Sequence, residues 1–218
     1  MKRLFDIICS FFGIILLSPI YLLFIIIISC TSRGGPFYLA KRIGYNGKTI
    51  YIVKFRSMKK ASFREGSFTI KDTDDRITKV GRFIRKTKID ELPQLFNVFI
   101  GQMSLVGPRP EVPPYAAGKL GDTSEEEILS VRPGMTDWAS IVLANQYALV
   151  NDSENSEVFF LTKIRPFKIY MQRYYVHNHS FFNDLLCILW TVRKVVTRTK
   201  KLPKKVQTAV DKFQLEVR

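Results

Sequence analysis

The sequence predicts an α+β protein that is mainly helical and associates with a membrane through its N-terminus. Residues 7–32 contain no charged side chain. Two short segments, 37–43 and 48–55, have the composition of strands and are joined by a Gly-rich turn. Most of the remaining chain has the apolar spacing of helices. We therefore expect a membrane segment over 1–33, a small cytosolic domain over 34–199 and a basic tail over 200–218.

Composition limits the classes of partner. The 218 residues include 34 Lys and Arg against 19 Asp and Glu, for a net charge of +15. Such a chain attracts polyanions: nucleic acid, anionic lipid or phosphorylated substrates. The 46% hydrophobic and 13% aromatic content excludes a disordered basic protein. Three cysteines without a recognisable spacing predict neither a disulfide framework nor a zinc site, and a reducing cytosol is the expected setting.

The uncharged N-terminal segment is long enough to cross a bilayer. Its 26 residues would form a helix of about 39 Å, against about 30 Å of hydrocarbon. Ser18-Pro19 interrupts it, because proline removes a backbone donor and kinks a helix. Positive residues flank both ends, Lys2 and Arg3 before it and Arg33 after it, and such residues favour the cytoplasm. A kinked span and a re-entrant helix–break–helix both fit; on these residues alone the span is favoured.

Two helices are expected around the middle of the chain. Asp74 or Asp75 can cap a helix that runs to about Lys86. A second helix follows Asp90-Glu91 and ends at Gly101.

The C-terminal third is expected to be helical. We predict a helix over 153–176 with a break at Pro166, and a strongly apolar helix over 180–198. Asp184 lies inside the second, and a membrane span would bury its charge. That helix is therefore expected to pack on the domain or to lie in the membrane interface.

Adjacent carboxylates and cations form the candidate site. Asp90 and Glu91 follow a basic run that includes Arg85, and Arg109 lies in a turn between two prolines. Such a set can hold a phosphate and a divalent metal together, and a carboxylate that attacks a phosphoryl group needs that setting. The alternative is a plain helix start, since acidic residues and Pro93 suit a first turn. Residue types alone favour this alternative.

Several motifs occur in one order over nearly all of residues 1–200. Together they favour a catalytic site at Asp90-Glu91 over a plain helix start. The chain resembles the bacterial sugar transferases known as monotopic phosphoglycosyl transferases. The motifs that carry the resemblance are Lys2-Arg3-Leu4-Phe5-Asp6, Ser18-Pro19, Arg42-Ile43-Gly44, Lys54-Phe55-Arg56-Ser57-Met58, Asp90-Glu91-Leu92-Pro93-Gln94-Leu95-Phe96-Asn97-Val98, Gly107-Pro108-Arg109-Pro110 and Arg132-Pro133-Gly134-Met135-Thr136. The sequence departs from many relatives at Asp137, where they carry Gly, and in the following residues.

The resemblance implies an activity and roles for particular residues. A sugar 1-phosphate would pass from a UDP-sugar to undecaprenyl phosphate, with release of UMP. Asp90 would be the nucleophile that forms an aspartyl phosphosugar, and Glu91 would help to hold Mg²⁺ or handle a proton. Asp90 and Glu91 are the expected metal ligands, a set that suits Mg²⁺. Lys54, Arg85 and Arg109 would bind phosphates.

The resemblance also implies where the protein acts. Ser18-Pro19 would form the break of a re-entrant hairpin, which makes 34–199 a catalytic domain on the cytoplasmic face of the bacterial inner membrane. Anionic lipid is an expected partner, nucleic acid is not, and a homodimer is left open. Two other classes are compatible with the sequence: a membrane-tethered basic binding protein without chemistry, and a single-span scaffold for glycan-assembly enzymes. Both rank below the transferase.

Overall fold

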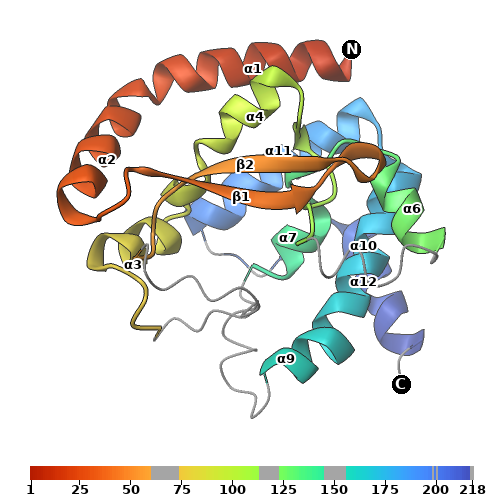
Figure 1. Ribbon diagram of the computed structural model, residues 1–218. Helices are drawn as coiled ribbons and strands as arrows, with labels where there is room; N and C mark the ends of the chain where they lie inside the picture. Colours follow the sequence, from red (N-terminus) through yellow and green to blue (C-terminus); the bar gives the residue numbers. More distant parts are fainter. Residues whose placement is uncertain (60–73, 113–122, 145–155, 198, 200, 217–218) are drawn as a thin grey trace.

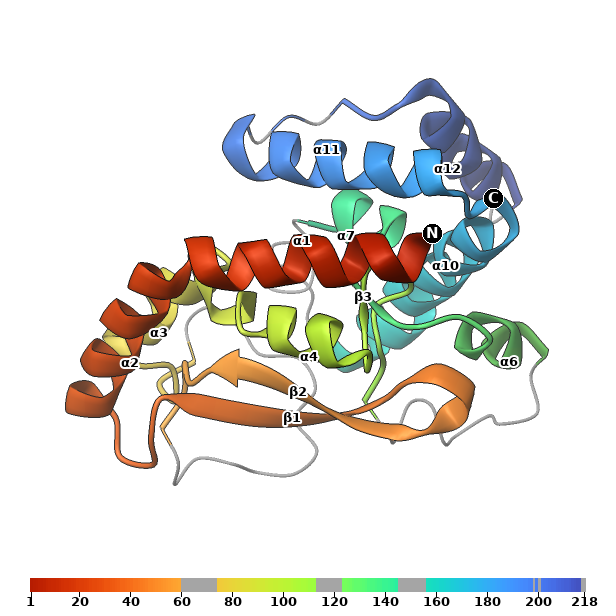
Figure 2. The same cartoon turned by 90° about the horizontal axis from the view of Figure 1, so that it is seen from above.

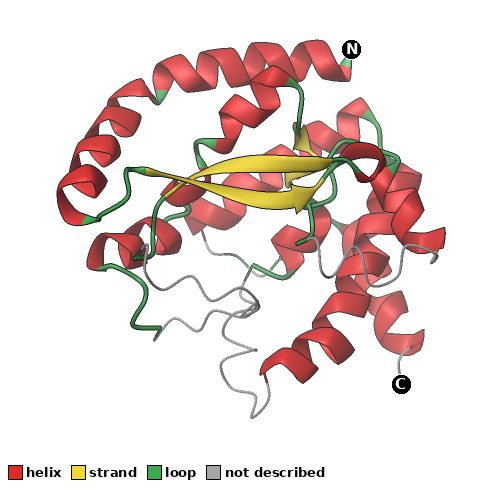
Figure 3. Cartoon of the chain, in the orientation of Figure 1, coloured by secondary structure: helices red, strands yellow, loops and turns green. Residues whose placement is uncertain are grey.

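The computed structural model describes residues 1–59, 74–112, 123–144, 156–197, 199 and 201–216. These residues form a mixed α/β fold that is mostly helical, with two small two-stranded sheets, and the predicted fold class is confirmed to that extent (Figure 1, Figure 3). Figure 2 looks down on the molecule and shows the N-terminal helix across the middle of the view, with a C-terminal helix beside it.

The apolar N-terminal segment forms two helices with a sharp bend between them. Helix α1 spans Lys2–Leu16 and α2 spans Ser18–Thr31, with Pro19 in the first turn of α2. The two axes differ by 59°. Among the described helices, none is long and apolar enough to cross a bilayer alone, whereas this bent pair meets the length and composition together. The predicted helix–break–helix is thus present, and the proline accounts for the bend.

Strand β1 (Phe37–Ile43) pairs antiparallel with β2 (Thr49–Phe55), as the sequence predicts. The connecting turn, η1 (Tyr45–Gly47), takes left-handed backbone at Asn46 and Gly47. Ile50 and Ile52 point into the core, in the alternation expected of a strand with one covered face.

Helix α3 spans Lys79–Lys86, and the predicted Asp74 or Asp75 cap is wrong. The Thr78 side chain accepts a hydrogen bond from the Gly81 amide at 2.8 Å and so caps the helix. Asp74 instead pairs with Arg76 at 2.5 Å in the turn before it. The predicted helix start therefore lies three or four residues too early.

A single 3₁₀ turn, η3 (Ile89–Glu91), separates α3 from α4 (Gln94–Ile100). Lys88 enters this turn with a left-handed φ of 60°, which ends α3 and reverses the chain. Gly101 ends α4 with a φ of 92°, as predicted from sequence. Buried Asn97 ties α4 to β2, since it accepts from the Val53 amide at 2.9 Å and donates to the Tyr51 carbonyl at 2.7 Å.

Strand β3 (Ser104–Val106) pairs in parallel with β4 (Gly134–Thr136). The two backbones approach so closely beyond β3 that a Cβ on Gly134 would lie 2.1 Å from the Gly107 nitrogen. Helix α7 (Trp138–Val142) follows β4 directly.

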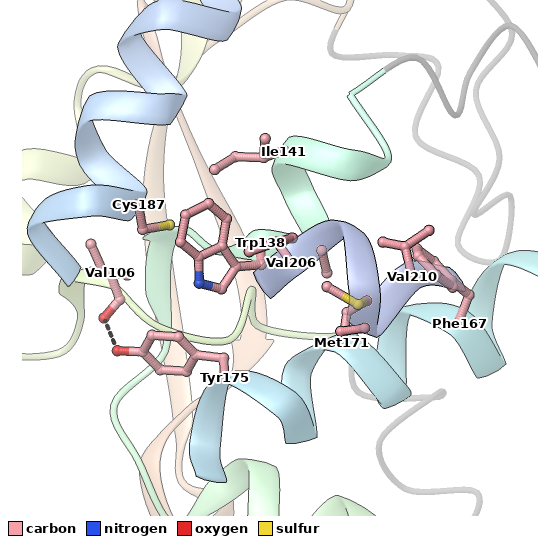
Figure 4. Close-up of a cluster of buried hydrophobic side chains, with 11 residues drawn as sticks. Val106, Trp138, Ile141, Phe167, Met171, Tyr175, Cys187, Val206 and Val210 are labelled. Atoms are coloured by element: carbon pink, nitrogen blue, oxygen red, sulfur yellow. Dashed lines mark hydrogen bonds between the residues drawn. The ribbon is translucent and has the colours of Figure 1, made fainter. Parts of the chain in front are cut away.

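Helices α10 (Arg165–Asn178), α11 (Phe181–Thr197) and α12 (Lys204–Glu216) build the largest core together with α7 and β3. The other helical segments described in this part of the chain are α6 (Thr123–Leu129), α9 (Ser156–Phe159) and the π-helical turn η4 (Phe160–Ile164). Trp138, Met171 and Tyr175 are buried at the centre of this core (Figure 4). The predicted break at Pro166 coincides with the change from π-helical to α-helical geometry, and residues 153–155 of that prediction lie outside the described residues.

The C-terminal segment differs from the basic tail expected over 200–218. Helix α12 packs on α10, and Val206, Ala209 and Val210 are buried in the core. These positions recur at i, i+3 and i+4, which buries one face while the lysines stay outside.

Candidate active site

The adjacent carboxylates Asp90 and Glu91 lie at the end of the 3₁₀ turn η3. The left-handed backbone at Lys88 turns the chain sharply, and Pro93 precedes the first residue of α4. Asp90 is 8% exposed, and its Oδ1 has no hydrogen-bond partner among the described residues. A buried carboxylate oxygen usually has a partner. The Asp90 carboxylate therefore has an acceptor atom available to something outside the described chain.

Two cations from distant segments converge on Glu91. Lys54, on β2, donates from Nζ to Glu91 Oε1 at 2.9 Å. Arg109, in the turn after β3, donates from a terminal guanidinium nitrogen to the same oxygen. Three predicted site residues that are 37 and 18 positions apart thus form one cluster.

The two carboxylates have opposite electrostatic settings. Burial and the charge of Glu91 raise the pKa of Asp90, and nearby Lys54, Lys88 and Arg85 only partly offset this. Burial alone would also raise the pKa of Glu91, but the charges of Arg109 and Lys54 overcome it and hold that pKa well below its usual value. Glu91 is therefore fixed as an anion with two cationic partners, whereas the charge on Asp90 is poorly compensated.

Arg85 lies close enough to influence the Asp90 carboxyl by its charge. It is in the last turn of α3, where a cation also opposes the negative end of the helix dipole. The predicted grouping of Arg85 with the site is therefore electrostatic in this structure, in contrast to the direct ion pairs of Lys54 and Arg109.

The turn that carries Arg109 is held by its backbone. The Arg109 amide donates to Asp137 Oδ2 at 3.2 Å, and Gln172 donates to the Arg109 carbonyl at 3.1 Å. The Arg109 guanidinium also donates to the Met135 carbonyl at 3.3 Å. These bonds, with prolines on both sides, fix the direction in which the guanidinium points.

Asp137 is a site-supporting residue that the sequence analysis did not assign. It is fully buried, and its Oδ1 accepts from the Ser140 amide at 2.7 Å, so it caps α7 as well as holding the Arg109 turn. An Asp three residues before a Ser, at the start of an apolar run, was a readable N-cap signal. Its contact with the Arg109 amide, 28 residues away along the chain, could not be predicted from the sequence pattern.

Arg42 is a further cation near this cluster. It is half-buried, and burial together with the charge of Arg109 lowers the pKa of its guanidinium, while Glu111 and Glu91 act in the opposite direction. The sequence analysis noted it only as part of a motif. It adds positive charge beside Arg109.

A largely apolar pocket adjoins the Arg109 turn. Its polar lining residues are Arg109, Glu111, Arg165 and Gln172. Its apolar wall consists of Ile43, Gly44, Pro108, Pro110, Ile128, Leu129, Val131, Pro133 and Ile169. Arg109 therefore belongs both to the carboxylate cluster and to the lining of this pocket.

No group of three Asp, Glu, His or Cys residues that could hold a metal ion by themselves occurs among the described residues. Mg²⁺ commonly uses one or two carboxylates together with substrate phosphates and water. Asp90 Oδ1 lacks a partner and Glu91 lies next to it in the same turn. Asp90 and Glu91 are the residues that would hold the ion.

The two histidines lie elsewhere and have structural partners. His177 pairs with Glu127 on α6, and a ring nitrogen of His179 lies 2.6 Å from the Val176 carbonyl. Neither is part of the carboxylate cluster.

Comparison with known proteins assigns this arrangement to a family. The profile of the family described as "Bacterial sugar transferase" matches residues 1–198. The chain is 36% identical over 203 residues to a UDP-N-acetylgalactosamine-undecaprenyl-phosphate N-acetylgalactosaminephosphotransferase of Aeromonas hydrophila, with 90% of this chain and 44% of that protein aligned. It is 34% identical to the exopolysaccharide production protein ExoY of Sinorhizobium fredii, with 89% and 84% aligned.

A third relative is the undecaprenyl-phosphate galactose phosphotransferase of Salmonella typhimurium, 38% identical over 217 residues. That alignment covers 91% of this chain and 40% of the relative. The chain therefore spans less than half the length of two of these three proteins and most of the third.

Proposed function

We propose that this chain, which belongs to the bacterial sugar transferase family, transfers a sugar 1-phosphate from a UDP-sugar to undecaprenyl phosphate. The products are a polyprenol diphosphate sugar and UMP, and the reaction begins the synthesis of a surface glycan. The relatives named above as undecaprenyl-phosphate sugar phosphotransferases support the acceptor and the type of reaction. The observation that carries the proposal is the difference between the two carboxylates: Glu91 has two cationic partners, and Asp90 Oδ1 has none among the described residues.

In the first step Asp90 attacks the phosphorus that bears the sugar. An Asp90 O–P bond forms, the P–O bond to the uridine-bearing phosphate breaks, and UMP leaves with that oxygen. In the second step an oxygen of the carrier phosphate attacks the same phosphorus, and the Asp90 O–P bond breaks. Asp90 returns as a carboxylate, so the enzyme is unchanged after one cycle.

The cationic side chains can stabilise the negative charge that shifts between oxygen atoms during these steps. The diphosphate of the donor brings negative charge to a site that already contains two carboxylates. Lys54 and Arg109, which point at Glu91, can share their donors with phosphate oxygens, and Arg85 adds positive potential nearby. Mg²⁺ bound by Asp90 and Glu91 would neutralise diphosphate charge. The bidentate geometry of Arg109 suits a phosphate in one orientation.

We further propose that α1 and α2 form a re-entrant hairpin at the cytoplasmic face of the bacterial inner membrane. The bend of 59° and the positive residues at both ends support this topology. The outward faces of the two helices are apolar, with exposed Leu4, Ile8, Phe11, Phe12, Ile15, Leu16, Leu22, Leu23 and Ile26. An apolar surface of this size in water would be costly, and hydrocarbon is the environment it fits.

Helix α11 extends the same surface. It presents Phe182, Leu189 and Val196, which are 80%, 58% and 75% exposed, while Asp184 on its other face is buried. Its Phe181 ring packs edge-on against Phe5 of α1, with centroids 5.3 Å apart. We therefore propose that α11 lies in the membrane interface next to the hairpin. Its packing on α7 and β3 confirms the other alternative predicted from sequence, that it packs on the domain.

The decisive experiment is intact-protein mass spectrometry after incubation with a panel of UDP-sugars and Mg²⁺, without carrier lipid. We expect a mass increase equal to one phosphosugar, mapped to Asp90, and exchange of labelled UMP into the UDP-sugar. Asp90→Asn should abolish both, because it keeps the shape but removes the attacking charge. Glu91→Gln should reduce metal-dependent turnover. If active wild-type protein showed neither adduct nor exchange with any donor, the two-step route would be refuted.

The topology is tested separately. Single-cysteine reporters, one inserted directly after Met1 on the Lys2 flank and one substituted at Arg33, are made in a variant without the native cysteines. Both should be shielded from a membrane-impermeant thiol reagent in intact cells and react after lysis. Labelling of one position alone in intact cells would establish a span and contradict the re-entrant hairpin.

A further inference from the structure

The N-terminal end of α1, residues 2–6, carries three charged residues that make specific contacts with the domain. From the sequence, Lys2 and Arg3 are positive flanks of a membrane segment, and Asp6 is a lone acid at its edge. In the structure Asp6 is 2% exposed, which a residue that acts only by its charge in solvent would not be. Each of the three reaches a part of the chain about 95 or more residues away.

Lys2 and Asp6 hold strand β3. Lys2 Nζ donates to the Val106 carbonyl at 2.9 Å, and the Leu105 amide donates to Asp6 Oδ1 at 3.0 Å. Two consecutive residues of β3 are therefore bonded to side chains of α1. Val106 is followed by Gly107 and Pro108, and then by Arg109 of the site.

Arg3 holds the end of α4. Its guanidinium donates to the Val98 carbonyl at 2.6 Å and to the Phe99 carbonyl at 2.7 Å. These are last-turn carbonyls, which lack the i+4 amide partner of a helix interior, and the Val98 carbonyl also accepts from the Gly101 amide at 3.1 Å. Because α4 begins directly after Asp90-Glu91 and Pro93, Arg3 fixes the element that follows the carboxylate pair.

A buried carboxylate on α11 fixes Lys2 in place. Asp184 is 4% exposed and forms an ion pair with Lys2. The Tyr175 hydroxyl donates to Asp184 Oδ1 at 2.8 Å and lies 3.2 Å from the Val106 carbonyl, a contact drawn in Figure 4. A buried carboxylate without its cation would be strongly unfavourable. The ion pair with Lys2 therefore explains why an acidic residue, Asp184, occurs within an apolar helix.

Near its bend, the hairpin makes a further contact with the domain. The Tyr21 hydroxyl, on α2 just beyond the bend, donates to the Leu92 carbonyl at 3.0 Å. Leu92 follows Glu91 directly. The membrane hairpin therefore contacts the chain next to the carboxylate pair, at the end of α4 and along β3.

We propose that Lys2, Arg3 and Asp6 form a positioning clamp that sets the distance between the Asp90-Glu91 turn and the Arg109 turn. They touch neither carboxylate, so they act through the backbones of α4 and β3. The clamp makes the membrane helix part of the support of the site as well as its anchor. The activity readout below rests on the function proposed above, whereas the hydrogen-exchange readout does not.

The test compares two variants that each remove one positive charge at the ends of the membrane segment. Lys2→Met is combined with Asp184→Asn, so that no unpaired buried charge remains and the protein can fold. Arg33→Met is the matched control, because Arg33 is exposed and lies at the far end of the segment. Both are purified from membranes and compared with wild type by thermal unfolding, to confirm that they are folded.

The first readout is amide hydrogen exchange in the peptide 103–110. We expect exchange at least tenfold faster in the Lys2→Met/Asp184→Asn variant, because β3 loses a donor to Val106 and the neighbouring bond to Asp6 loosens. Arg33→Met should match wild type. Unchanged exchange in both variants would overturn the clamp, whatever the protein catalyses.

The second readout is the exchange of labelled UMP into UDP-sugar without carrier lipid. We expect at least a tenfold fall in the clamp variant and less than a twofold change for Arg33→Met. In an Arg109→Lys background the clamp variant should cause less than a threefold further fall, since the group it positions is already impaired. Equal losses in the clamp and control variants, or losses that multiply with Arg109→Lys, would overturn the proposal. Absence of exchange in wild type with every UDP-sugar tested would instead refute the two-step route of the proposed function, and the hydrogen-exchange readout would then decide the clamp alone.

Discussion

Replacing either carboxylate of the Asp90-Glu91 pair by its amide should move the stability of the protein in opposite directions. Glu91→Gln leaves Lys54 and Arg109 without the oxygen that both contact. Asp90→Asn removes a charge that is buried, repelled by Glu91 and without a hydrogen bond at Oδ1 among the described residues. The two positions are adjacent and the substitutions are chemically identical, so each serves as the control for the other.

The magnitude for Glu91→Gln follows from the exposure of the three partners. Side chains of Glu91, Lys54 and Arg109 are 19%, 18% and 30% exposed. Removal of one partner from a fully buried pair costs about 3–5 kcal/mol. Solvent reaches this cluster, so we expect a loss of about 2 kcal/mol, intermediate between buried and surface pairs. For a chain of this length that lowers Tm by about 4–8 °C.

The effect of Asp90→Asn has the opposite sign. A raised pKa in the folded state means that the unfolded chain ionises more easily, so the carboxylate charge destabilises the fold above the folded pKa. We expect the amide to raise stability by about 0.5–1 kcal/mol at neutral pH, or Tm by about 1–4 °C. Active-site residues often lower stability while they provide activity, so a gain in stability on removal of a candidate nucleophile is expected.

The pH dependence provides an independent check of both signs. The advantage of Asp90→Asn should shrink as pH falls through the raised folded pKa of Asp90 toward its unfolded value of about 3.9. The deficit of Glu91→Gln should persist to lower pH, because the depressed folded pKa of Glu91 keeps its contribution until pH falls below the unfolded value of about 4.3.

The assay is thermal unfolding of detergent-solubilised protein at pH 7 and at several values down to pH 4. Each variant is compared with wild type at equal protein and detergent concentration. A fall in Tm for Asp90→Asn as large as that for Glu91→Gln would refute the reasoning, since it would mean that both carboxylates are equally well paired.

Three further predictions concern Arg109 of the site, Gly134 next to its turn, and Pro19 of the membrane hairpin. Arg109→Lys should lower UMP release at least tenfold, about 1.4 kcal/mol, because the ammonium loses the planar fork; near-normal rates in a folded variant would make Arg109 a structural residue. Gly134→Ala should lower the free energy of unfolding by at least about 2 kcal/mol, since its Cβ would lie 2.1 Å from the Gly107 nitrogen; an unchanged Tm would contradict that close approach. Pro19→Ala should straighten the α1–α2 break and increase thiol labelling at one flank in intact cells, and unchanged protection would show that the proline is not needed for the bend.

The cluster of Lys54, Glu91 and Arg109 was predictable only from the order of motifs along the chain. Spacing places Asp90 and Glu91 before a helix but does not bring a β2 lysine and a distant turn to the same oxygen. The β1–β2 hairpin and the Gly101 end of α4 were predictable because each has a local cause, alternation in one case and left-handed backbone in the other.

The contacts that the sequence did not reveal are pairings over long separations. Lys2 meets Asp184 across 182 residues, and Asp137 meets the Arg109 amide across 28. An acid inside an apolar helix signals that a partner exists but not which one it is. Helix α12 was missed for another reason: the basic composition of the segment concealed a short apolar stripe, Val206, Ala209 and Val210.

The pairing of both cations with Glu91 also bears on how the site receives its substrate. A donor diphosphate that approached unshielded Lys54 and Arg109 would be bound strongly wherever it first met them. Because Glu91 already shares its Oε1 with both, a phosphate must compete with a carboxylate and gains most where it can also reach another positive group. Arg85 acts by its charge on the Asp90 carboxyl, and Lys88 acts on both carboxyls, so each adds positive potential around Asp90. The distribution of charge therefore favours a phosphoryl group held against Asp90, which is where a nucleophilic carboxylate would need it.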